Sequence, residues 1–203
     1  MIAIIDYGLG NINAIYTVYK NLDIPVKIVS TSSDLGNARK LILPGVGSFD
    51  YAMEKLNQSG MRDTLDDLVQ NDKMDILGIC VGMQMLTRFS DEGVLPGLGW
   101  MDAEVKKFNQ DMDYELSIPH MGWNNIIPKK ENPLLAGLYN SSYFYFLHSY
   151  YFNAHDTTNI LSTTLYGSNF ISIVNKNNIY GVQFHPEKSH ETGITLLKNY
   201  SDL

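Results

Sequence analysis

The stretch Asp75-Ile-Leu-Gly-Ile-Cys80-Val-Gly-Met-Gln84 decides how the first half of the chain folds. Its apolar residues lead into Cys80, which has Gly78 two positions before it and Gly82 two positions after it. Glycines at these places are typical of a tight turn that joins a strand to a helix and presents a nucleophile, because side chains there would crowd the turn. The stretch therefore predicts a buried strand over residues 75–79 that runs into Cys80, followed by a helix over residues 82–89.

Cys80 has two interpretations. A lone cysteine is most often a buried structural residue. In the predicted turn, however, the sulfur lies at the N-terminus of a helix, where the dipole and free N–H groups favour a thiolate and can stabilise an oxyanion. The flanking glycines favour the nucleophile. Because the sequence has one cysteine, it contains neither an internal disulfide nor a paired-cysteine metal or redox motif.

The rest of the chain continues an α/β pattern around this strand. Short β-rich runs alternate with helical ones in the first half, as in a parallel sheet with crossover helices. The second half is richer in aromatic and β-branched residues and predicts antiparallel hairpins, one turning at residues 175–178. We expect a single three-layer α/β domain over residues 1–203, with a mixed, mostly parallel sheet whose later strands are partly antiparallel. The expected strands are 2–6, 26–29, 40–43, 104–108, 143–151, 160–164, 170–174 and 179–184, and the expected helices are 11–22, 48–56, 62–69 and 192–200.

Composition and charge exclude several classes of function. A hydrophobic content of 44% with 18% charged residues is that of a globular protein with a substantial core. The net charge of −7 leaves no basic stripe for phosphates, so nucleic acid is not an expected partner. The apolar start of the chain is too short for a signal peptide, and no apolar run is long enough to span a membrane. We therefore expect a cytoplasmic protein.

His185 and Glu187 are the candidate partners of the thiol. His185 follows an expected strand, and Pro186 favours an extended backbone before it. Because side chains two residues apart in an extended segment point to the same side, His185 and Glu187 can face one site as a base and its orienting group. The alternatives are a solvated surface loop and a metal site that includes His190, although the spacing fits no helical zinc pair.

Other motifs are weaker. His120 and His148 lie among apolar or aromatic residues and are expected to be hydrogen-bonded in the core or at an interface, whereas His155 is expected to be exposed. The segment Gly8-Leu-Gly10 would need a third glycine at Asn13 to make a dinucleotide-binding motif. Neither a cofactor nor a metal is therefore expected.

The segments around Cys80 and His185 together resemble the triad-type, class I glutamine amidotransferases. These segments are Gly78-Ile-Cys80-Val-Gly82-Met-Gln84 and Gly181-Val-Gln-Phe-His185-Pro-Glu187-Lys-Ser189. Further matches are Asp6-Tyr-Gly8-x-Gly10-Asn11, Pro44-Gly-Val-Gly47, Pro119-His-Met-Gly-Trp123-Asn124 and Phe-x-His148-Ser-Tyr-Tyr151. The motifs follow the family's order and cover essentially the whole chain. The resemblance implies a flavodoxin-like three-layer fold and a glutaminase.

The resemblance implies a role for each residue of the site. Cys80 would attack the side-chain amide of glutamine, His185 would transfer protons, and Glu187 would orient His185. The turn from Pro44 to Gly47 is similar to the family's oxyanion strand. The residues implied to stabilise the oxyanion are Gly45, Val46 and Val81, and those implied to bind glutamine are Gly47, Gln84, Glu92, Ser149 and Tyr150.

The finer motifs are similar to a branch of the family whose glutaminase passes ammonia to a (β/α)8-barrel cyclase subunit in histidine biosynthesis. Such a glutaminase is expected to be nearly idle alone and to form a heterodimer with its partner. The residues implied to lie at the interface are Asn11, Trp123, Asn124 and Lys188. A core tryptophan is the alternative interpretation of Trp123.

Three alternatives stay open. The residues Thr87-Arg88 are more similar to those of related glutaminases that supply ammonia to a cyclase-like partner, which modifies a surface-glycan sugar. This similarity puts the identity of the ammonia acceptor in question. An inactive binding module of the same fold is disfavoured by the intact Cys80, His185 and Glu187. A cysteine hydrolase or protease of related fold usually takes its histidine from beside the turn, where this chain has Val81 instead.

Overall fold

The computed structural model describes residues 1–108 and 117–203, and its centre is one large sheet. Eight strands form this sheet in the order β2-β1-β3-β4-β13-β12-β11-β8. The strands from β2 to β13 run parallel, whereas β12, β11 and β8 each pair antiparallel. This confirms the predicted mixed sheet with antiparallel later strands. In sheet order the strands span Val26–Val29, Ile2–Ile5, Lys40–Gly45, Asp75–Cys80, Ile179–Val182, Ser168–Lys176, Ile160–Tyr166 and Ile127–Pro128.

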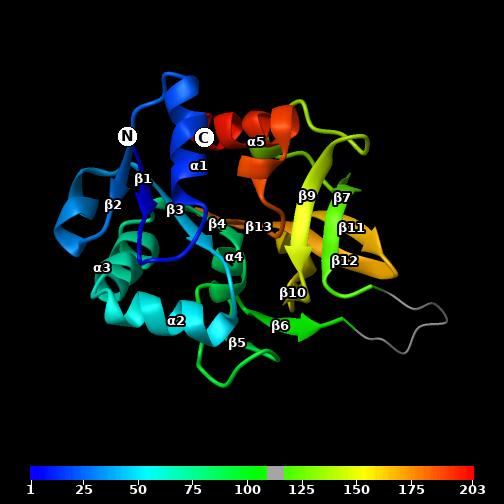
Figure 1. Ribbon diagram of the computed structural model, residues 1–203, viewed down its shortest axis with the longest axis horizontal. Coiled ribbons are helices and arrows are strands. Elements are labelled where there is room, and N and C mark those ends of the chain that lie inside the picture. Colours follow the sequence, from blue (N-terminus) through cyan, green and yellow to red (C-terminus); the bar gives the residue numbers. More distant parts are fainter. Residues whose placement is uncertain (109–116) are drawn as a thin grey trace.

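Helices cover both faces of the sheet and complete the predicted three layers (Figure 1). On one face lie α1 and α5, and on the other lie α2, α3 and α4. In numerical order these helices span Ile12–Asn21, Phe49–Gln58, Arg62–Asp66, Val81–Met85 and His190–Asp202. A π-helical turn, Asp67–Asn71, continues α3, and short 3-10 turns span Ser32–Asn37, Pro133–Leu135, Thr157–Asn159 and Pro186–Lys188.

The helices form where apolar residues recur at helical spacing. In α1, Ile15 and Tyr19 lie four residues apart and are both buried against the sheet side of the helix. The Tyr19 hydroxyl donates a hydrogen bond of 3.0 Å to the Leu197 carbonyl of α5, which joins the two helices of this layer. The buried hydroxyl is thereby satisfied, so the large ring can remain in the core.

Two smaller sheets lie at the side of the molecule away from β2 (Figure 1). One contains β10 (Tyr150–Ala154), β6 (Ala103–Lys107) and β5 (Phe89–Ser90). The other pairs β7 (His120–Asn125) antiparallel with β9 (Tyr143–His148). The sequence predicted neither β5, β7 nor β8.

The predicted helix over residues 82–89 was too long, because α4 ends at Met85. The carbonyl oxygens of Met85 and Leu86 accept hydrogen bonds from a later loop. Leu98 N–H donates to the Met85 carbonyl at 2.8 Å, and Met101 N–H donates to the Leu86 carbonyl at 3.0 Å. These contacts replace the next helical turn, and the chain enters β5 at Phe89. A long-range contact therefore ended the helix.

The predicted single strand over residues 143–151 was also wrong. The chain changes sheets at Ser149, since β9 pairs with β7 and β10 pairs with β6. The carbonyl of Tyr150 bonds instead to two side chains, His148 and Gln84. This break creates a bend beside Cys80.

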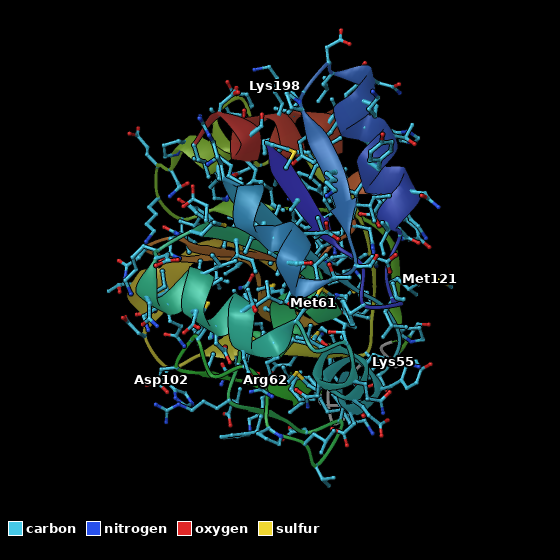
Figure 2. The ribbon with its side chains drawn as sticks, turned by 90° about the vertical axis from the view of Figure 1, so that its left-hand side faces the viewer. Lys55, Met61, Arg62, Asp102, Met121 and Lys198 are labelled. Carbon is cyan, nitrogen blue, oxygen red and sulfur yellow. The ribbon has the colours of Figure 1, made fainter. Side chains whose placement is uncertain are left out.

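Polar side chains such as Lys55 and Lys198 cover the outside of the helical layers (Figure 2). Residues 109–116, between β6 and β7, lie outside the described residues. Within residues 1–108 and 117–203, no helix combines the length and apolarity that a membrane crossing needs.

Candidate active site

The turn at Cys80 forms as its sequence predicts. Cys80 ends β4 with φ 54° and ψ −112°, and α4 starts at Val81, so the sulfur lies at the helix N-terminus. A side chain at Gly82 would come within 1.9 Å of the Leu43 carbonyl oxygen, and one at Gly78 would come within 2.7 Å of the Gly82 oxygen. The glycines are thus required by the close approach of β3, β4 and α4. The left-handed backbone at Cys80 is a strained conformation of the kind found at functional sites.

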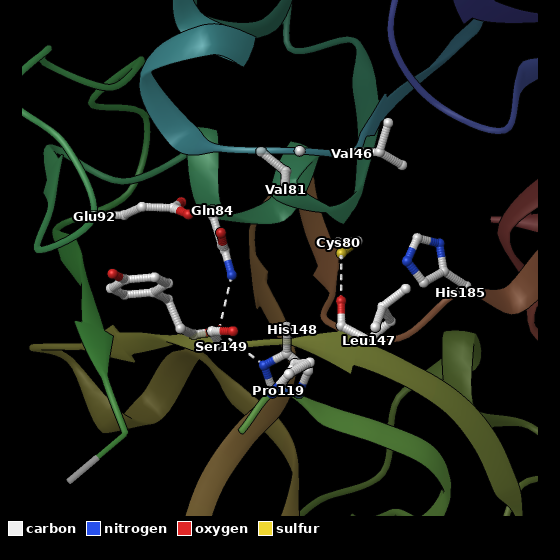
Figure 3. Close-up of a pocket in the computed structure, with 12 residues that line it drawn as sticks. Val46, Cys80, Val81, Gln84, Glu92, Pro119, Leu147, His148, Ser149 and His185 are labelled. Atoms are coloured by element: carbon white, nitrogen blue, oxygen red, sulfur yellow. Dashed lines mark hydrogen bonds between the residues drawn. The ribbon is translucent and has the colours of Figure 1, made fainter. Parts of the chain in front are cut away.

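A pocket of about 280 Å³ opens over the sulfur (Figure 3). It is lined from two sides, by the turns after β3 and β4 and by the bend between β9 and β10. Its lining residues are Val46, Gly47, Cys80, Val81, Gln84, Glu92, Pro119, Leu147, His148, Ser149, Tyr150 and His185. Cys80 and all five predicted glutamine-binding residues therefore share one cavity.

His185 and Glu187 meet beside this pocket. His185 Nδ1 lies 2.9 Å from Glu187 Oε1, and both side chains are buried. The carboxylate can only accept, so Nδ1 carries the hydrogen and Nε2 is left to exchange a proton with the thiol. Figure 3 shows the imidazole ring facing Cys80.

The geometry of the pair differs from the expected extended segment. His185 is extended, with φ −101° and ψ 93°, but Glu187 lies in the 3-10 turn that Pro186 begins. The side chains meet because this turn folds the carboxylate back onto the ring. The prediction that His185 and Glu187 face each other is confirmed, and the predicted strand alternation is wrong.

Charge stabilises the protonated imidazole. Burial disfavours the charged form of His185, but the negative charges of Cys80 and Glu187 outweigh burial and raise the pKa of His185 to about 10. Burial also acts against the Glu187 carboxylate, yet the bond and charge of His185 hold the pKa of Glu187 below its ordinary value. The site thus favours the protonated form of His185.

Asn11 contributes to this arrangement in a way that its sequence position did not indicate. Its amide Nδ2 donates a hydrogen bond of 2.7 Å to Glu187 Oε1, the same oxygen that His185 contacts. Asn11 immediately precedes α1, so a helix terminus fixes the orienting carboxylate. The predicted interface role of Asn11 stays a prediction.

Gln84 and Gln183 are hydrogen-bonded to each other beside the pocket. Gln84 Nε2 donates to the Tyr150 carbonyl at 3.0 Å and to Gln183 Oε1 at 3.1 Å. Gln183 Nε2 in turn lies 3.9 Å from the sulfur of Cys80. This chain of contacts ties the nucleophile to the bend at Tyr150.

Glu92 lies at the far end of the pocket from His185 (Figure 3). Its Oε2 accepts a hydrogen bond of 2.9 Å from the Phe49 N–H at the start of α2. Asp50 fastens the following loop by accepting from Val94 N–H at 2.9 Å and Leu95 N–H at 3.0 Å. Burial raises the pKa of Glu92 above its ordinary value, while the Phe49 bond opposes that rise. A carboxylate held in this way suits an ammonium group.

Two of the three predicted oxyanion residues line the pocket that contains the sulfur. Val46 and Val81 line the pocket. Gly45 lies beneath the turn instead, where an added side chain would come within 2.4 Å of the Gly82 nitrogen. Gly47 lines the pocket with φ 87°, a conformation that glycine adopts without strain.

Trp123 lies on the outward face of β7, whereas the Asn124 side chain lies on the opposite face of that strand. Trp123 is 48% exposed and stacks at 5.0 Å on His190, so the alternative of a core tryptophan is wrong. Asn124 donates to the Leu165 carbonyl at 3.0 Å. Lys188 lies 5.7 Å above the Tyr145 ring. The interface role of these residues stays a prediction.

Sequence reasoning missed several residues around the sulfur. Pro119 and Leu147 line the pocket, and the Leu147 carbonyl lies 3.8 Å from Cys80 Sγ. These contacts depend on the pairing of β7 with β9, which the sequence did not reveal. Gln183 could have been found, since it lies two residues before His185 in an expected strand and so on the same side.

The other histidines match their expected surroundings. His120 and His148 are buried and hydrogen-bonded to each other, and His155 is exposed beside Asp102. Among the described residues, no group of three histidine, cysteine or acidic side chains is arranged to hold a metal ion.

Comparison with known proteins identifies the family. The family described as Glutamine amidotransferase class-I matches residues 3–201. The chain belongs to the class I glutamine amidotransferases. It is therefore an enzyme of the family that its motifs resemble.

Two relatives of this amidotransferase are similar over their full length. Imidazole glycerol phosphate synthase subunit HisH of Bdellovibrio bacteriovorus is 53% identical over 204 residues, which covers 100% of both chains. The protein of the same name from Leptospira borgpetersenii is 50% identical over 204 residues, again covering 100% of both chains. The solved structure of PurLQS from Thermotoga maritima is 16% identical, covers 99% of this chain and 97% of its own, and has a TM-score of 0.75, which supports the fold.

Proposed function

We propose that this amidotransferase is the glutaminase subunit of an imidazole glycerol phosphate synthase. It would hydrolyse glutamine to glutamate and pass the ammonia to a synthase partner. The observation that carries the proposal is the placement of Cys80, at a helix N-terminus, against an imidazole whose other nitrogen is bound to a buried carboxylate. This is the arrangement of an activated nucleophile, its base and the group that orients the base.

The reaction follows from this arrangement. The Cys80 thiolate attacks the side-chain carbonyl carbon of glutamine and forms a tetrahedral oxyanion, which N–H groups near Val46 and Val81 stabilise. The His185 imidazolium donates its Nε2 proton to the leaving nitrogen, so that ammonia departs and a γ-glutamyl thioester remains. His185 then removes a proton from water, the hydroxide displaces the thiolate, and glutamate leaves.

The pocket provides groups for both ends of the substrate. The half-buried Glu92 carboxylate suits the α-ammonium group, and backbone groups at Ser149 and Tyr150 suit the α-carboxylate. Gln84 and Gly47 line the space between these groups and Cys80. Glutamine would therefore bind with its amide carbon at the sulfur.

An apolar face beside the pocket suits a partner subunit. Side chains alternate along β7 and β9, and the outward set includes Met121, Trp123, Tyr143 and Leu147, which are 65%, 48%, 52% and 38% exposed. Met121 projects from the edge of the molecule (Figure 2). Leu147 also lines the pocket, so the face is continuous with the site. We place a (β/α)8-barrel cyclase here, with Asn11, Trp123, Asn124 and Lys188 at the interface.

The ammonia acceptor is proposed to belong to histidine biosynthesis. The partner would use ammonia to make imidazole glycerol phosphate and an aminoimidazole carboxamide ribotide. Relatives at 53% and 50% identity are both named as subunits of the synthase of imidazole glycerol phosphate. Their names do not favour the alternative acceptor, a surface-glycan sugar.

We further propose that residues 1–203 work as one amidotransferase domain and that the protein acts in the cytoplasm. The match of one family over residues 3–201 supports the single domain.

Ammonia release tests this proposal. Wild type mixed with the cognate cyclase subunit should release ammonia from glutamine, Cys80→Ala should release none, and the exposed variant Lys20→Ala should match wild type. Ammonium salts should restore the cyclase reaction in the Cys80→Ala complex. Activity that survives Cys80→Ala would contradict the thiol mechanism. Failure of the histidine-pathway cyclase to bind or stimulate the chain would contradict the proposed acceptor.

A further inference from the structure

Behind the pocket, three polar side chains form a continuous hydrogen-bonded line that the glutaminase mechanism does not use. His148 Nδ1 lies 2.8 Å from the Tyr150 carbonyl oxygen, and His148 Nε2 lies 3.0 Å from His120 Nδ1. His120 Nε2 lies 3.3 Å from the amide nitrogen of Asn124, which also donates to the Leu165 carbonyl at 3.0 Å. The line thus runs from Asn124 in β7 to the bend at Ser149 and Tyr150 that lines the pocket.

The partners at the two ends determine the direction of every bond in this line. A carbonyl oxygen can only accept, so His148 Nδ1 carries a hydrogen. In a neutral imidazole the other nitrogen is then bare, and His148 Nε2 must accept from His120 Nδ1–H. His120 Nε2 is bare for the same reason and accepts from the Asn124 amide. Each donor therefore has one acceptor, and both rings have the Nδ1–H tautomer.

Burial keeps both rings neutral. His120 and His148 are 3% and 6% exposed, and both pack against the ring of Phe170. Burial lowers the pKa of His120 to about 4 and that of His148 to about 3. The neighbouring titratable groups His120 and His185 also lower the pKa of His148, and no carboxylate in the described part of the chain pairs with the ring of His120 or His148.

The receiving end of the line is a part of the pocket. The Tyr150 carbonyl accepts from His148 and from Gln84, and Figure 3 marks both bonds with dashed lines. Two donors from opposite sides fix this peptide where the chain changes from β9 to β10. Loss of the His148 bond would leave the carbonyl with Gln84 as its side-chain donor and would hold the bend less firmly.

We propose that His120 and His148 are positioning residues that hold the Ser149–Tyr150 segment in the conformation that binds the α-carboxylate of the substrate. The inference rests on the proposed glutaminase function, because it assigns that segment to glutamine binding. Neither histidine touches the reacting atoms, so their loss acts on substrate affinity. It follows that the hydrogen bond, and not the bulk of the ring, is the property that matters at position 120.

A matched pair of variants separates the hydrogen bond from packing. Asparagine and leucine have nearly the same shape, and the asparagine amide can take the place of His120 Nδ1–H. In the complex with the cognate cyclase, His120→Leu should raise KM for glutamine about tenfold with little change in kcat. His120→Asn should stay within about threefold of wild type. Phe170→Leu, which trims the same cluster without removing a hydrogen bond, should also stay in that range.

Equal KM values for His120→Leu and His120→Asn, or an equal rise in Phe170→Leu, would overturn the proposal. A second measurement does not depend on catalysis: long-range proton–nitrogen spectra of the full chain should show the Nδ1–H tautomer for both histidines. An Nε2–H tautomer in either would overturn it as well. Absence of Cys80-dependent glutaminase activity in wild type would instead contradict the proposed function, and the tautomers would still be read directly.

Discussion

The two walls of the pocket are built in different ways. The wall that carries Cys80 is made of adjacent parallel strands and a helix packed so closely that Gly78 and Gly82 have no room for side chains. The opposite wall, at Ser149 and Tyr150, is a bend between two small sheets that polar side chains hold. Close packing therefore fixes the nucleophile, and hydrogen bonds fix the residues that we propose bind the substrate.

This difference has a physical consequence. A backbone held by close packing can accept the strained conformation at Cys80, because relaxing it would require β3, β4 and α4 to separate. A bend held by hydrogen bonds costs less to move, because each bond contributes only about 1 kcal/mol net to stability. Changes in the first wall should affect catalysis or folding, whereas changes in the second should affect binding.

The largest expected effect comes from His185→Gln. The variant removes the group that protonates the leaving nitrogen, and kcat should fall by about 10³ to 10⁴. Because the side chain is buried in a pair with Glu187, the urea midpoint should be measured with the kinetics. A fall in kcat of less than tenfold would show that catalysis by Cys80 does not depend on His185.

Gly82→Ala tests the close packing directly. Its new methyl group would lie 1.9 Å from the Leu43 carbonyl oxygen, so the free energy of unfolding should fall by about 3 kcal/mol or more. Gly36→Ala is the matched control, since no atom lies within 4 Å of its added methyl group, and it should change stability by less than about 0.5 kcal/mol. Equal urea midpoints for the two variants would show that the turn is not closely packed.

Asn11→Ala should have a smaller effect on catalysis. It removes a 2.7 Å charge-assisted bond to Glu187 and leaves His185 as the one side-chain partner of that carboxylate among the described residues. Since bonds to charged groups contribute about 1.5–3 kcal/mol, kcat should fall about ten- to a hundredfold while KM stays close to wild type. Steady-state kinetics in the cyclase complex measure the split, and a rise in KM alone would place Asn11 outside the triad.

The last prediction concerns how the free energy of unfolding depends on pH. Folded His120 and His148 have pKa values of about 4 and 3, below the ordinary value of about 6.5. The unfolded chain therefore takes up protons first as the pH falls, and the free energy of unfolding should fall by up to about 1.4 kcal/mol per pH unit for each histidine between about pH 6 and 4.5. The raised pKa of His185 acts in the opposite window, because its contribution is present below pH 6.5 and is lost as the pH rises toward 10.

Urea unfolding at several pH values measures this slope. In His120→Leu the slope between pH 6 and 4.5 should be smaller, because one of the two buried imidazoles is gone. An unchanged slope would mean that His120 is protonated in the folded chain, in conflict with the neutral line of hydrogen bonds.

The same difference between the two walls explains what the sequence could predict. Cys80 with its two glycines, and His185 with Pro186 and Glu187, are each written in a few consecutive residues whose local geometry follows from steric rules. The sheet type and the three layers follow from the alternation of runs. The choice of glutamine as the substrate came from the resemblance to a family, because no local structural rule identifies a substrate.

The rest depends on how distant segments pair. The contact of His120 with His148 requires β7 to align with β9, and residues 120–125 give no clear strand pattern. The break at Ser149 is not visible in an aromatic run that looks like one strand. The early end of α4 is caused by bonds from Leu98 and Met101, which no helix signal near Met85 encodes.

Trapping the acyl-enzyme tests the central claim most directly. The complex of wild type with its cyclase subunit is mixed with glutamine, quenched in acid and digested for mass spectrometry. We expect a γ-glutamyl thioester on the peptide that contains Cys80 in wild type and no adduct in Cys80→Ala. Ammonia release in the same samples without any adduct on Cys80 would contradict the account.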